Sequence, residues 1–168
     1  MQGVSLRMAR PDDAPAMTVM QRASWLAAYG EVLGADMLAQ LSVTEHLQIW
    51  QSRLAESGPR PMLLCQDEVV IGLLYWQLVL DGTEPNALIR AFYLHPDHWR
   101  QGHGKRLWQA VAMQMRRAGC DSVRLWLLDG NRIGEGFYLR RGFVFDGQER
   151  TLMSLGQACL QRQMFRLL

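Results

Sequence analysis

The stretch from Tyr93 to Leu107 reads YLHPDHWRQGHGKRL. It contains, in succession, the end of an apolar strand, a break at Pro96, a loop with Gly102 and Gly104, and the start of a helix. The first N–H groups of a helix have no intrahelical partner and lie at the positive end of the helix dipole, and glycine lets an anion approach the backbone closely. The stretch therefore predicts a phosphate-binding loop.

Two widespread phosphate loops do not fit these residues. A Walker loop needs four residues between its glycines and a Lys-Ser or Lys-Thr pair, whereas His103 alone separates Gly102 from Gly104. A dinucleotide-binding loop needs a third glycine and an acidic residue on the following strand, and both are absent. Arg100, Lys105 and Arg106 add positive charge. On these residues alone, a simple tight turn before a helix is the alternative.

Hydrophobic periodicity outward from this loop predicts the remaining elements. They are a strand at Val4–Ala9, a helix ending near Tyr29, a helical region that begins near Gly34, restarts at Ser42 and ends at Gly58, strands at Pro61–Gln66, Val69–Leu80 and Leu88–Leu94, a helix with apolar positions from Leu107 to Gly119, a strand around Val123–Leu127, a helix at Arg132–Arg141, and strands at Phe143–Arg150 and Ala158–Leu167. Antiparallel hairpins are thus combined with one parallel crossover. We expect an α/β (α+β) fold with a mixed twisted sheet of about seven strands flanked by about four helices.

The composition narrows the class of protein. A chain of 168 residues, 49% hydrophobic and 20% charged, predicts one globular domain over residues 1–168. No apolar run approaches the ~20 residues that span a bilayer, and the first ten residues lack a signal-peptide core, so we expect a cytoplasmic protein with no membrane partner. The net charge of +2 is spread along the chain, which argues against nucleic acid.

Cysteine and histidine do not predict a metal site. The three cysteines are scattered without metal-ligand spacing, which fits inert thiols in a reducing compartment. His95, His98 and His103 have no cysteine or carboxylate cluster beside them. We therefore expect no metal.

A second block of residues follows the crossover. Asn131 comes after a strand, Phe137-Tyr138 lies in the next helix, and Gly142-Phe143 follows that helix. With the glycine loop, this block resembles the GCN5-related N-acetyltransferase (GNAT) superfamily, whose patterns are Q/R-x-x-G-x-G/A after a strand and then N-x-x-A-x-x-F-Y-x-x-x-G-F. Trp99 stands at the first loop position here, and Gly134 stands in the alanine place.

The resemblance implies an acyl-CoA N-acyltransferase fold that splays near Leu94 and Leu127 and holds acetyl-CoA in the opening. It implies direct transfer of an acetyl group from acetyl-CoA to a primary amine. The residues that it assigns to acetyl-CoA are Phe92, Tyr93, Leu94, Trp99, Arg100, Gln101, Gly102, His103, Gly104, Lys105, Asn131, Gly134, Phe137 and Tyr138.

Two of these residues are the expected catalytic groups. The backbone N–H of Leu94 would stabilise the oxyanion, and the Tyr138 hydroxyl would protonate the departing thiolate. The Asn131 amide would hydrogen-bond the pantetheine arm, and Phe137 would pack against it. The alternatives are a Tyr138 that packs at the edge of the core and an Asn131 that caps a helix.

The acceptor side is less defined. Trp25 and Tyr29 are four residues apart, hence on one helix face, and the resemblance places them at the acceptor pocket; the alternative is packing beneath the second helix. No general base is evident, because Leu88 stands where family members often carry glutamate; Glu84 or a water chain is the substitute.

We expect a small-molecule amine rather than a protein as acceptor, and the sequence is compatible with a homodimer. The rival functions are a catalytically silent acyl-CoA binding or sensing module and a transferase of longer acyl groups.

Overall fold

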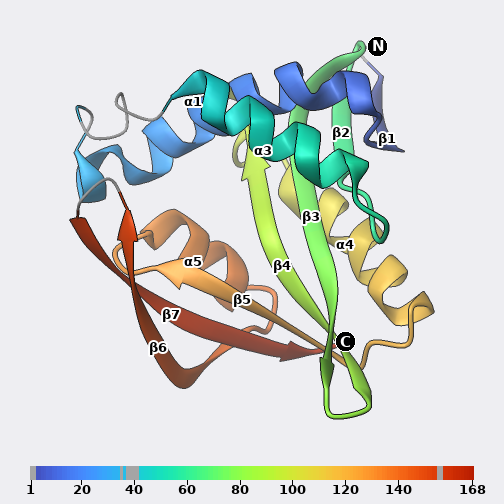
Figure 1. Cartoon of the computed structure of the whole chain (residues 1–168), viewed down its shortest axis with the longest axis vertical. Coiled ribbons are helices and arrows are strands. Elements are labelled where there is room, and N and C mark those ends of the chain that lie inside the picture. The colour runs from blue at the N-terminus through green and yellow to red at the C-terminus, as the bar shows by residue number, and fades with distance from the viewer. Residues whose placement is uncertain (1–2, 35, 37–41, 155–156) are drawn as a thin grey trace.

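The computed structural model describes residues 3–34, 36, 42–154 and 157–168, which form one seven-stranded sheet and four α-helices (Figure 1). The strands are β1 (Val4–Met8), β2 (Met62–Gln66), β3 (Val69–Asp81), β4 (Glu84–Leu94), β5 (Ser122–Leu128), β6 (Val144–Ser154) and β7 (Gln157–Leu167), and the helices are α1 (Ala14–Leu33), α3 (Val43–Ala55), α4 (His103–Arg117) and α5 (Arg132–Leu139). This order of strands and helices confirms the predicted one. The part of the second helical region expected between Gly34 and Ser42 lies mostly outside the described residues, and the part after Ser42 is α3.

The strand order in the sheet is β1-β2-β3-β4-β5-β7-β6. All neighbouring strands are antiparallel except β4 and β5, which are parallel and joined through α4. The predicted turn at Asp67-Glu68 joins β2 to β3, with both residues at positive φ (47° and 69°). The sheet is therefore mixed, with one parallel crossover at its centre.

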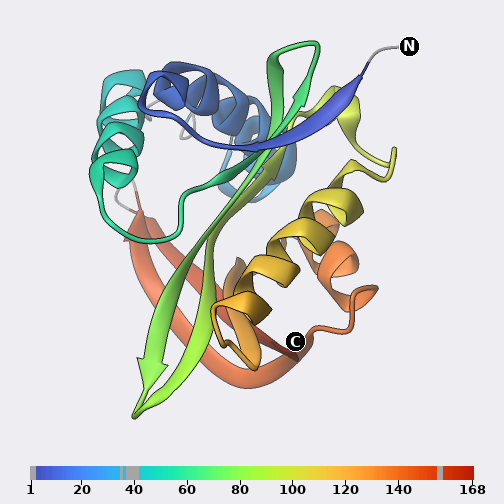
Figure 2. The same cartoon turned by 90° about the vertical axis from the view of Figure 1, so that its right-hand side faces the viewer.

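Helices cover the two faces of the sheet (Figures 1 and 2). On one face lie α4 and α5, and Leu107, Val111 and Met115 of α4 are fully buried there, as their spacing of four predicts. On the other face lie α1 and α3. Trp50 of α3 is fully buried beneath them, and its indole N–H donates to Gln21 Oε1 of α1 at 2.6 Å. Two apolar cores thus sandwich the sheet.

Strand β4 and helix α4 begin earlier than the apolar pattern of the sequence predicts. β4 begins at Glu84 rather than Leu88, because the hairpin with β3 continues through polar residues to the pair Asp81↔Glu84. Helix α4 begins at His103, four residues before its first apolar position, because Gly102 supplies its N-cap. Among the described residues, no helix combines the length and apolarity that a membrane crossing requires.

The two central parallel strands separate early. Pairing between β4 and β5 runs from Ala87↔Val123 to Ile89↔Leu125, three residue pairs in all. The register of β4 against β3 shifts at the same level, so that Arg90 has no partner on β3 and forms a bulge. The divergence thus begins directly after Ile89 and Leu125, earlier than the predicted points at Leu94 and Leu127. It opens the sheet at its centre.

Candidate active site

A cavity of about 660 Å³ lies where β4 and β5 diverge. Its walls come from the end of β4, the loop before α4, the first turn of α4, α5 and the middle of α1. Twelve of the residues predicted to bind acetyl-CoA line it: Phe92, Tyr93, Leu94, Trp99, Arg100, Gly102, Gly104, Lys105, Asn131, Gly134, Phe137 and Tyr138. The fold therefore brings the glycine loop and the second sequence block to one space.

Three predicted site residues do not line the cavity. Gln101 is exposed, and its side-chain amide donates to the Asp97 carbonyl at 2.8 Å, which braces the loop. His103 is the first residue of α4, and its ring contacts that of His98. Trp25 packs against His46 of α3, with ring centroids 5.3 Å apart, so it lies beneath the second helix. Tyr29, by contrast, lines the cavity.

The start of α4 presents unpaired backbone donors. Gly102 is its N-cap with φ +81°, and the first intrahelical bond runs from the Arg106 N–H to the Gly102 carbonyl at 3.1 Å. The N–H groups of residues 103–105 precede this bond and have no helical acceptor. Arg100, held at φ +60°, and Lys105 bring two positive charges to the cavity wall. Donors and charge together suit a phosphate group.

Two glycines allow close packing around the cavity. A Cβ on Gly104 would lie 2.7 Å from Phe137 Cε2 and 3.2 Å from Leu94 Cδ1, so the first turn of α4 rests directly on α5 and β4. A Cβ on Gly134 would lie 2.6 Å from Asn131 Nδ2. Gly134 therefore accommodates the Asn131 side chain in this chain.

The backbone of Leu94 faces away from β3. The His95 N–H donates to the Ile71 carbonyl at 2.8 Å, which makes Gly72↔Leu94 a non-hydrogen-bonded pair of the antiparallel ladder. The Leu94 N–H and C=O consequently point toward the divergence between β4 and β5. The Trp99 indole N–H donates to the Leu94 carbonyl at 2.9 Å. The Trp99 side chain thus satisfies the Leu94 carbonyl, while the Leu94 N–H faces the cavity.

Aromatic rings form the floor of the cavity. The Tyr138 ring is buried and contacts those of Phe92, Phe137 and Phe143, with centroids 5.3–6.2 Å apart. Burial raises the pKa of the Tyr138 hydroxyl well above its usual value near 10. Burial also raises the pKa of Tyr29, and the Asn131 amide opposes this by a smaller amount. These hydroxyls therefore remain protonated at neutral pH.

Asn131 caps α5, as one of its two expected roles requires. Its Oδ1 accepts from the Gly134 N–H at 3.0 Å, and its side chain is buried at the cavity wall. This bond uses one lone pair of Oδ1, and the two N–H donors of Nδ2 take no part in it. The same side chain can cap the helix and donate into the cavity.

The base candidates lie away from Tyr138. Leu88 lies on β4 between Gln77 and Arg124, which are its register partners. Glu84 begins β4 ten residues before Leu94, about 33 Å at roughly 3.3 Å per residue. Glu84 is therefore too distant to take a proton from an amine at the Leu94 end of the cavity.

Some cavity residues were missed by the sequence analysis: Ser24, Ala28, Arg132, Ile133, Gly136, Arg140 and Arg141. Arg141 stacks on Phe137, with Cζ 3.6 Å from the ring centroid, and donates to the Phe137 carbonyl at 3.0 Å. Its i,i+4 spacing from Phe137 is the signal that predicts this contact. Ser24 and Ala28 are also four residues apart on α1, beside Tyr29.

Comparisons with known proteins show which proteins this chain resembles. The model of a family described as the acetyltransferase (GNAT) family matches residues 23–143. An uncharacterized N-acetyltransferase, YuaI of Bacillus subtilis (strain 168), is 26% identical over 131 residues, which cover 76% of this chain and 73% of that protein.

Two solved structures have the same fold. The PaiA N-acetyltransferase from Thermoplasma acidophilum, solved in complex with coenzyme A, superposes with a TM-score of 0.82 at 17% identity, covering 99% of both chains. The ribosomal-protein-S18-alanine N-acetyltransferase from Escherichia coli has a TM-score of 0.72 at 16% identity, covering 98% of this chain and 94% of that one.

Proposed function

The chain belongs to the acetyltransferase (GNAT) family, and on this premise we propose that it transfers an acetyl group directly from acetyl-CoA to the primary amine of a small molecule. One observation carries the proposal. The unpaired N–H groups at the start of α4, the inward-facing Leu94 N–H and the Tyr138 hydroxyl all border one cavity of about 660 Å³. These are the groups that binding a phosphorylated thioester and cleaving it require.

Phosphates of acetyl-CoA would be held at the start of α4. The N–H groups of residues 103–105 would donate to them, and Arg100 and Lys105 would neutralise their charge. The pantetheine arm would run between the diverging strands, where the outward-facing backbone of β4 lacks a β5 partner. Asn131 Nδ2 would donate to that arm, and Phe137 would pack against it.

Leu94 and Tyr138 would perform the chemistry. The Leu94 N–H would stabilise the oxyanion formed when the amine attacks the thioester. Tyr138 would donate its proton to the departing sulfur, and the raised pKa of its hydroxyl keeps that proton in place beforehand. Burial also raises the pKa of a thiol beside it, so the thiolate leaving group needs a proton at the same place. General-acid help of this kind contributes about 10²–10⁴ in rate.

Proton removal from the amine would not use a carboxylate at position 88. Leu88 offers no titratable group, and Glu84 is too far along β4. An amine whose own pKa is low, or a water chain to solvent, would supply the neutral nucleophile. The lack of a carboxylate base near the reaction centre, from position 84 or position 88, favours a second candidate function, that of a catalytically silent acyl-CoA binding or sensing module.

Longer acyl groups are a third candidate function, which the packing disfavours. They would need room beside Leu94 and Phe137, where Gly104 already lies too close to accept a Cβ. Thermal shift with acyl-CoA chains of increasing length tests this candidate. We expect stabilisation to be largest for acetyl-CoA.

Amine-dependent thiol release tests the proposal. Purified protein is mixed with acetyl-CoA and a panel of small amines, and free thiol is measured with a chromogenic disulfide. We expect release that depends on both the amine and the protein. Acetyl-CoA binding without release from any amine would favour the sensing module instead.

A further inference from the structure

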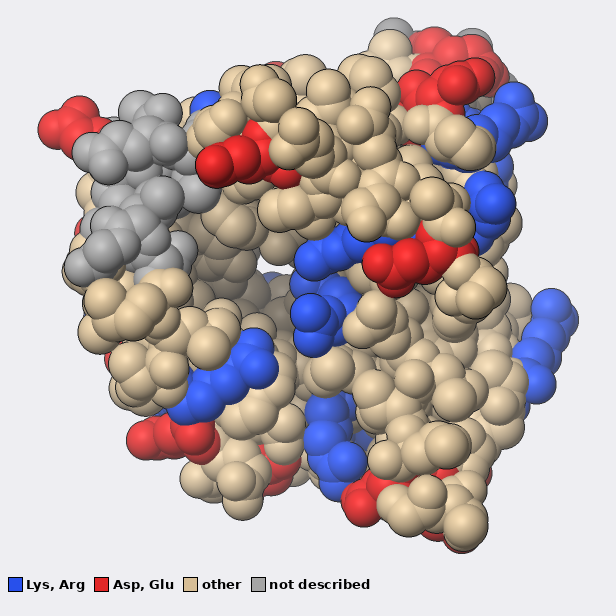
Figure 3. All heavy atoms as spheres, viewed as in Figure 1, with Lys and Arg blue, Asp and Glu red and all other residues tan. Residues whose placement is uncertain are grey.

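One face of the sheet is only partly covered by helices. In Figure 1, α1 and α3 cross its upper part, while the lower part between the β3–β4 arm and the β6–β7 arm has no described helix in front of it. The space-filling view of the same side shows a hollow at its centre (Figure 3). Lys and Arg side chains run along this hollow, and acidic side chains adjoin its upper border.

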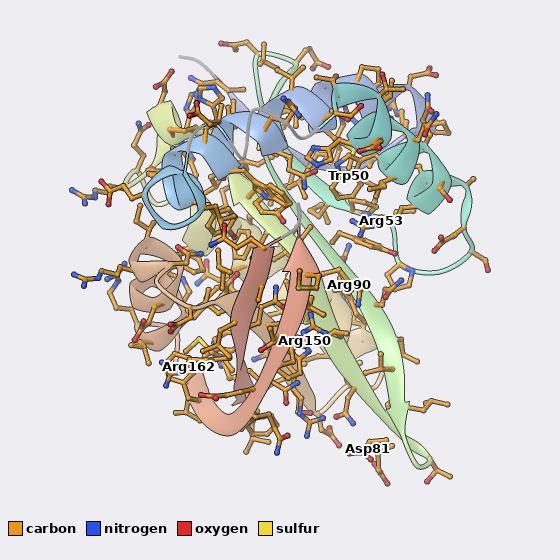
Figure 4. All side chains as sticks on the ribbon, turned by 60° about the vertical axis from the view of Figure 1, so that its left-hand side comes forward. Trp50, Arg53, Asp81, Arg90, Arg150 and Arg162 are labelled. Atoms are coloured by element: carbon orange, nitrogen blue, oxygen red, sulfur yellow. The ribbon has the colours of Figure 1, made fainter. Side chains whose placement is uncertain are left out.

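Three arginines from distant parts of the chain lie one below another on this face, namely Arg53 of α3, Arg90 of β4 and Arg150 of β6 (Figure 4). We call them the arginine groove. Burial is the main reason why the pKa of Arg53 and the pKa of Arg150 are lowered. The positive charge of Arg90 lowers both pKa values further. The Arg90 guanidinium is therefore close enough to repel each of the other two.

The groove arginines form no ion pair within 4.0 Å with the acidic side chains of the described residues. The ion pairs within 4.0 Å among the described residues are Arg7–Asp13, His95–Asp97 and Arg162–Glu149, and none includes a groove arginine. The Glu56 carboxylate, directly after α3, raises the pKa of Arg53, but by less than burial lowers it. Among the described residues, Glu56 is the one carboxylate that acts on Arg53 or Arg150, so the three guanidinium groups keep a net positive charge.

Neighbouring side chains hold two of the groove arginines, Arg53 and Arg150, in place. Arg53 Cζ lies 5.1 Å from the centroid of the Trp50 ring, and Arg150 Cζ lies 4.3 Å from that of the Trp126 ring. Arg150 Nε also donates to Gln161 Oε1 at 2.7 Å. Aromatic stacking and one hydrogen bond orient these guanidinium groups and leave their remaining N–H donors available for an anion.

The groove adjoins the proposed reaction centre. Arg90 is the bulge residue at the point where β4 leaves β5, and it lies four residues before Leu94, about 13 Å at roughly 3.3 Å per residue. Tyr93 connects the two regions, because it lines the cavity and packs against the core beneath α1 and α3.

We propose that the acceptor is a small amine that also carries a carboxylate or a phosphate group, and that the arginine groove binds this anion while the amine reaches Leu94. The proposal rests on the proposed acetyl transfer and deepens it. The same charge repels acceptors with a second ammonium group, so the groove determines specificity through attraction and repulsion together.

Amines of matched length test the proposal. Steady-state rates are measured with 4-aminobutanoate, 3-aminopropyl phosphate, butylamine and 1,4-diaminobutane at low ionic strength. We expect at least one anionic amine to show a kcat/KM at least tenfold above those of butylamine and the diamine, with the gap shrinking as salt screens the charges. The two anionic amines separate a carboxylate preference from a phosphate preference. An equal or higher kcat/KM for the diamine would overturn the proposal.

Arginine variants locate the effect. Arg90→Gln and Arg150→Gln should each reduce the ratio of kcat/KM for the anionic amine to that for butylamine at least fivefold, chiefly through KM. Arg162→Gln is the matched control, since Arg162 stacks on Phe145 at 4.0 Å and pairs with Glu149 away from the groove (Figure 4). It should leave the ratio unchanged. Equal ratios in all variants would contradict the assignment of the groove.

A measurement without turnover keeps the two proposals apart. Calorimetric titration with glutarate at low salt should show binding to the wild type and at least fivefold weaker binding to Arg90→Gln. If no amine releases thiol, acetyl transfer fails while glutarate binding still tests the groove. If thiol release succeeds but glutarate does not bind and anionic amines have no advantage, the groove proposal alone fails.

Discussion

Tyr138 combines a packed ring with a hydroxyl at the cavity wall. Its ring lies among Phe92, Phe137 and Phe143, which fixes the direction in which the hydroxyl points. Because burial raises the pKa of this hydroxyl above its usual value near 10, the tyrosine stays neutral at pH 7 and well above it. A single side chain thus serves both the core and the chemistry.

Removal of the Tyr138 hydroxyl separates these two roles. Tyr138→Phe keeps the ring contacts, so we expect an unchanged dissociation constant for acetyl-CoA and a fall in turnover of at least about tenfold, the low end of general-acid contributions. Steady-state thiol release and calorimetry measure the two quantities. Wild-type turnover should not decline below about pH 10 through loss of the Tyr138 proton, since its pKa lies above that of free tyrosine. Unchanged turnover in the variant would remove Tyr138 from the mechanism.

A second residue-level prediction concerns stability. The Asp13 carboxylate accepts from both terminal nitrogens of Arg7, at 2.7 and 2.8 Å, and from the Arg10 N–H at 2.6 Å. The hydrogen bonds from Arg7 lower the pKa of Asp13, in spite of partial burial. At pH 7 we expect Asp13→Asn to lower the free energy of unfolding by about 1–3 kcal/mol, the range for a hydrogen-bonded charge.

The pH dependence of this difference has a definite sign. Because the folded pKa of Asp13 is depressed, its contribution is complete above its unfolded pKa of about 3.9 and is lost as the pH falls through the folded value. The free energies of unfolding of the wild type and the variant, measured with urea, should therefore begin to converge as the pH falls below about 4. Asp12→Asn, at the exposed neighbouring position, is the control and should change stability by less than about 0.5 kcal/mol.

At the level of elements, the start of α4 depends on two glycines for different reasons. Gly102 adopts φ +81°, which side chains with a Cβ rarely adopt, although the space beside it is open. Gly104 has ordinary helical geometry but no space, because Phe137 and Leu94 touch it. The first glycine sets the direction of the helix, and the second lets the helix approach the cavity.

Gly104→Val should disrupt acetyl-CoA binding. Its Cβ would displace the Phe137 ring and its methyl groups would enter the loop, so we expect at least a tenfold rise in the dissociation constant measured by calorimetry. Gly30→Ala is the control, because a Cβ at that position of α1 would have no described atom within 4 Å apart from those of its own stretch of helix. It should fold normally and bind acetyl-CoA as the wild type does. Equal affinities of the two variants would mean that the loop is misassigned.

The elements were predictable from sequence to the extent that their signals are local. Periodicity placed Leu107, Val111 and Met115 on the buried face of α4, and the resemblance to a family connected the glycine loop with Asn131 and Tyr138. The early start of β4 was missed because backbone pairing with β3, rather than an apolar pattern, extends that strand. The start of β4 is thus set by its pairing with β3, which a pattern of single residues does not reveal.

The arginine groove was not predictable from sequence. Arg53, Arg90 and Arg150 come from α3, β4 and β6, and no local pattern relates positions separated by 37 and 60 residues (53 to 90 and 90 to 150). Their proximity follows from the sheet order and the bulge at Arg90. Trp99 is similar, because its bond to the Leu94 carbonyl depends on how the loop folds back on β4.

At the scale of the whole molecule, the sheet opens between its two halves. β1 to β4 form one arm, β5 to β7 form the other, and three residue pairs of β4 and β5 join the arms. Residues on both sides of this seam line the cavity. A ligand held there contacts both arms and should stabilise them together.

Acetyl-CoA should therefore raise the melting temperature. A ligand at 100 times its dissociation constant adds about 2.7 kcal/mol to the free energy of unfolding. For a chain of this size that corresponds to about 5–11 °C. Differential scanning fluorimetry measures the shift, with Gly104→Val as the control. A shift of equal size in the variant would indicate binding elsewhere.

Calorimetric titration of the wild-type protein with acetyl-CoA tests the central claim most directly, since everything else depends on the cavity between β4 and β5. We predict saturable binding with a dissociation constant in the micromolar range and a stoichiometry of one per chain, which weakens at least tenfold in Gly104→Val. Absence of binding, or binding that this variant leaves unchanged, would contradict the assignment of the cavity.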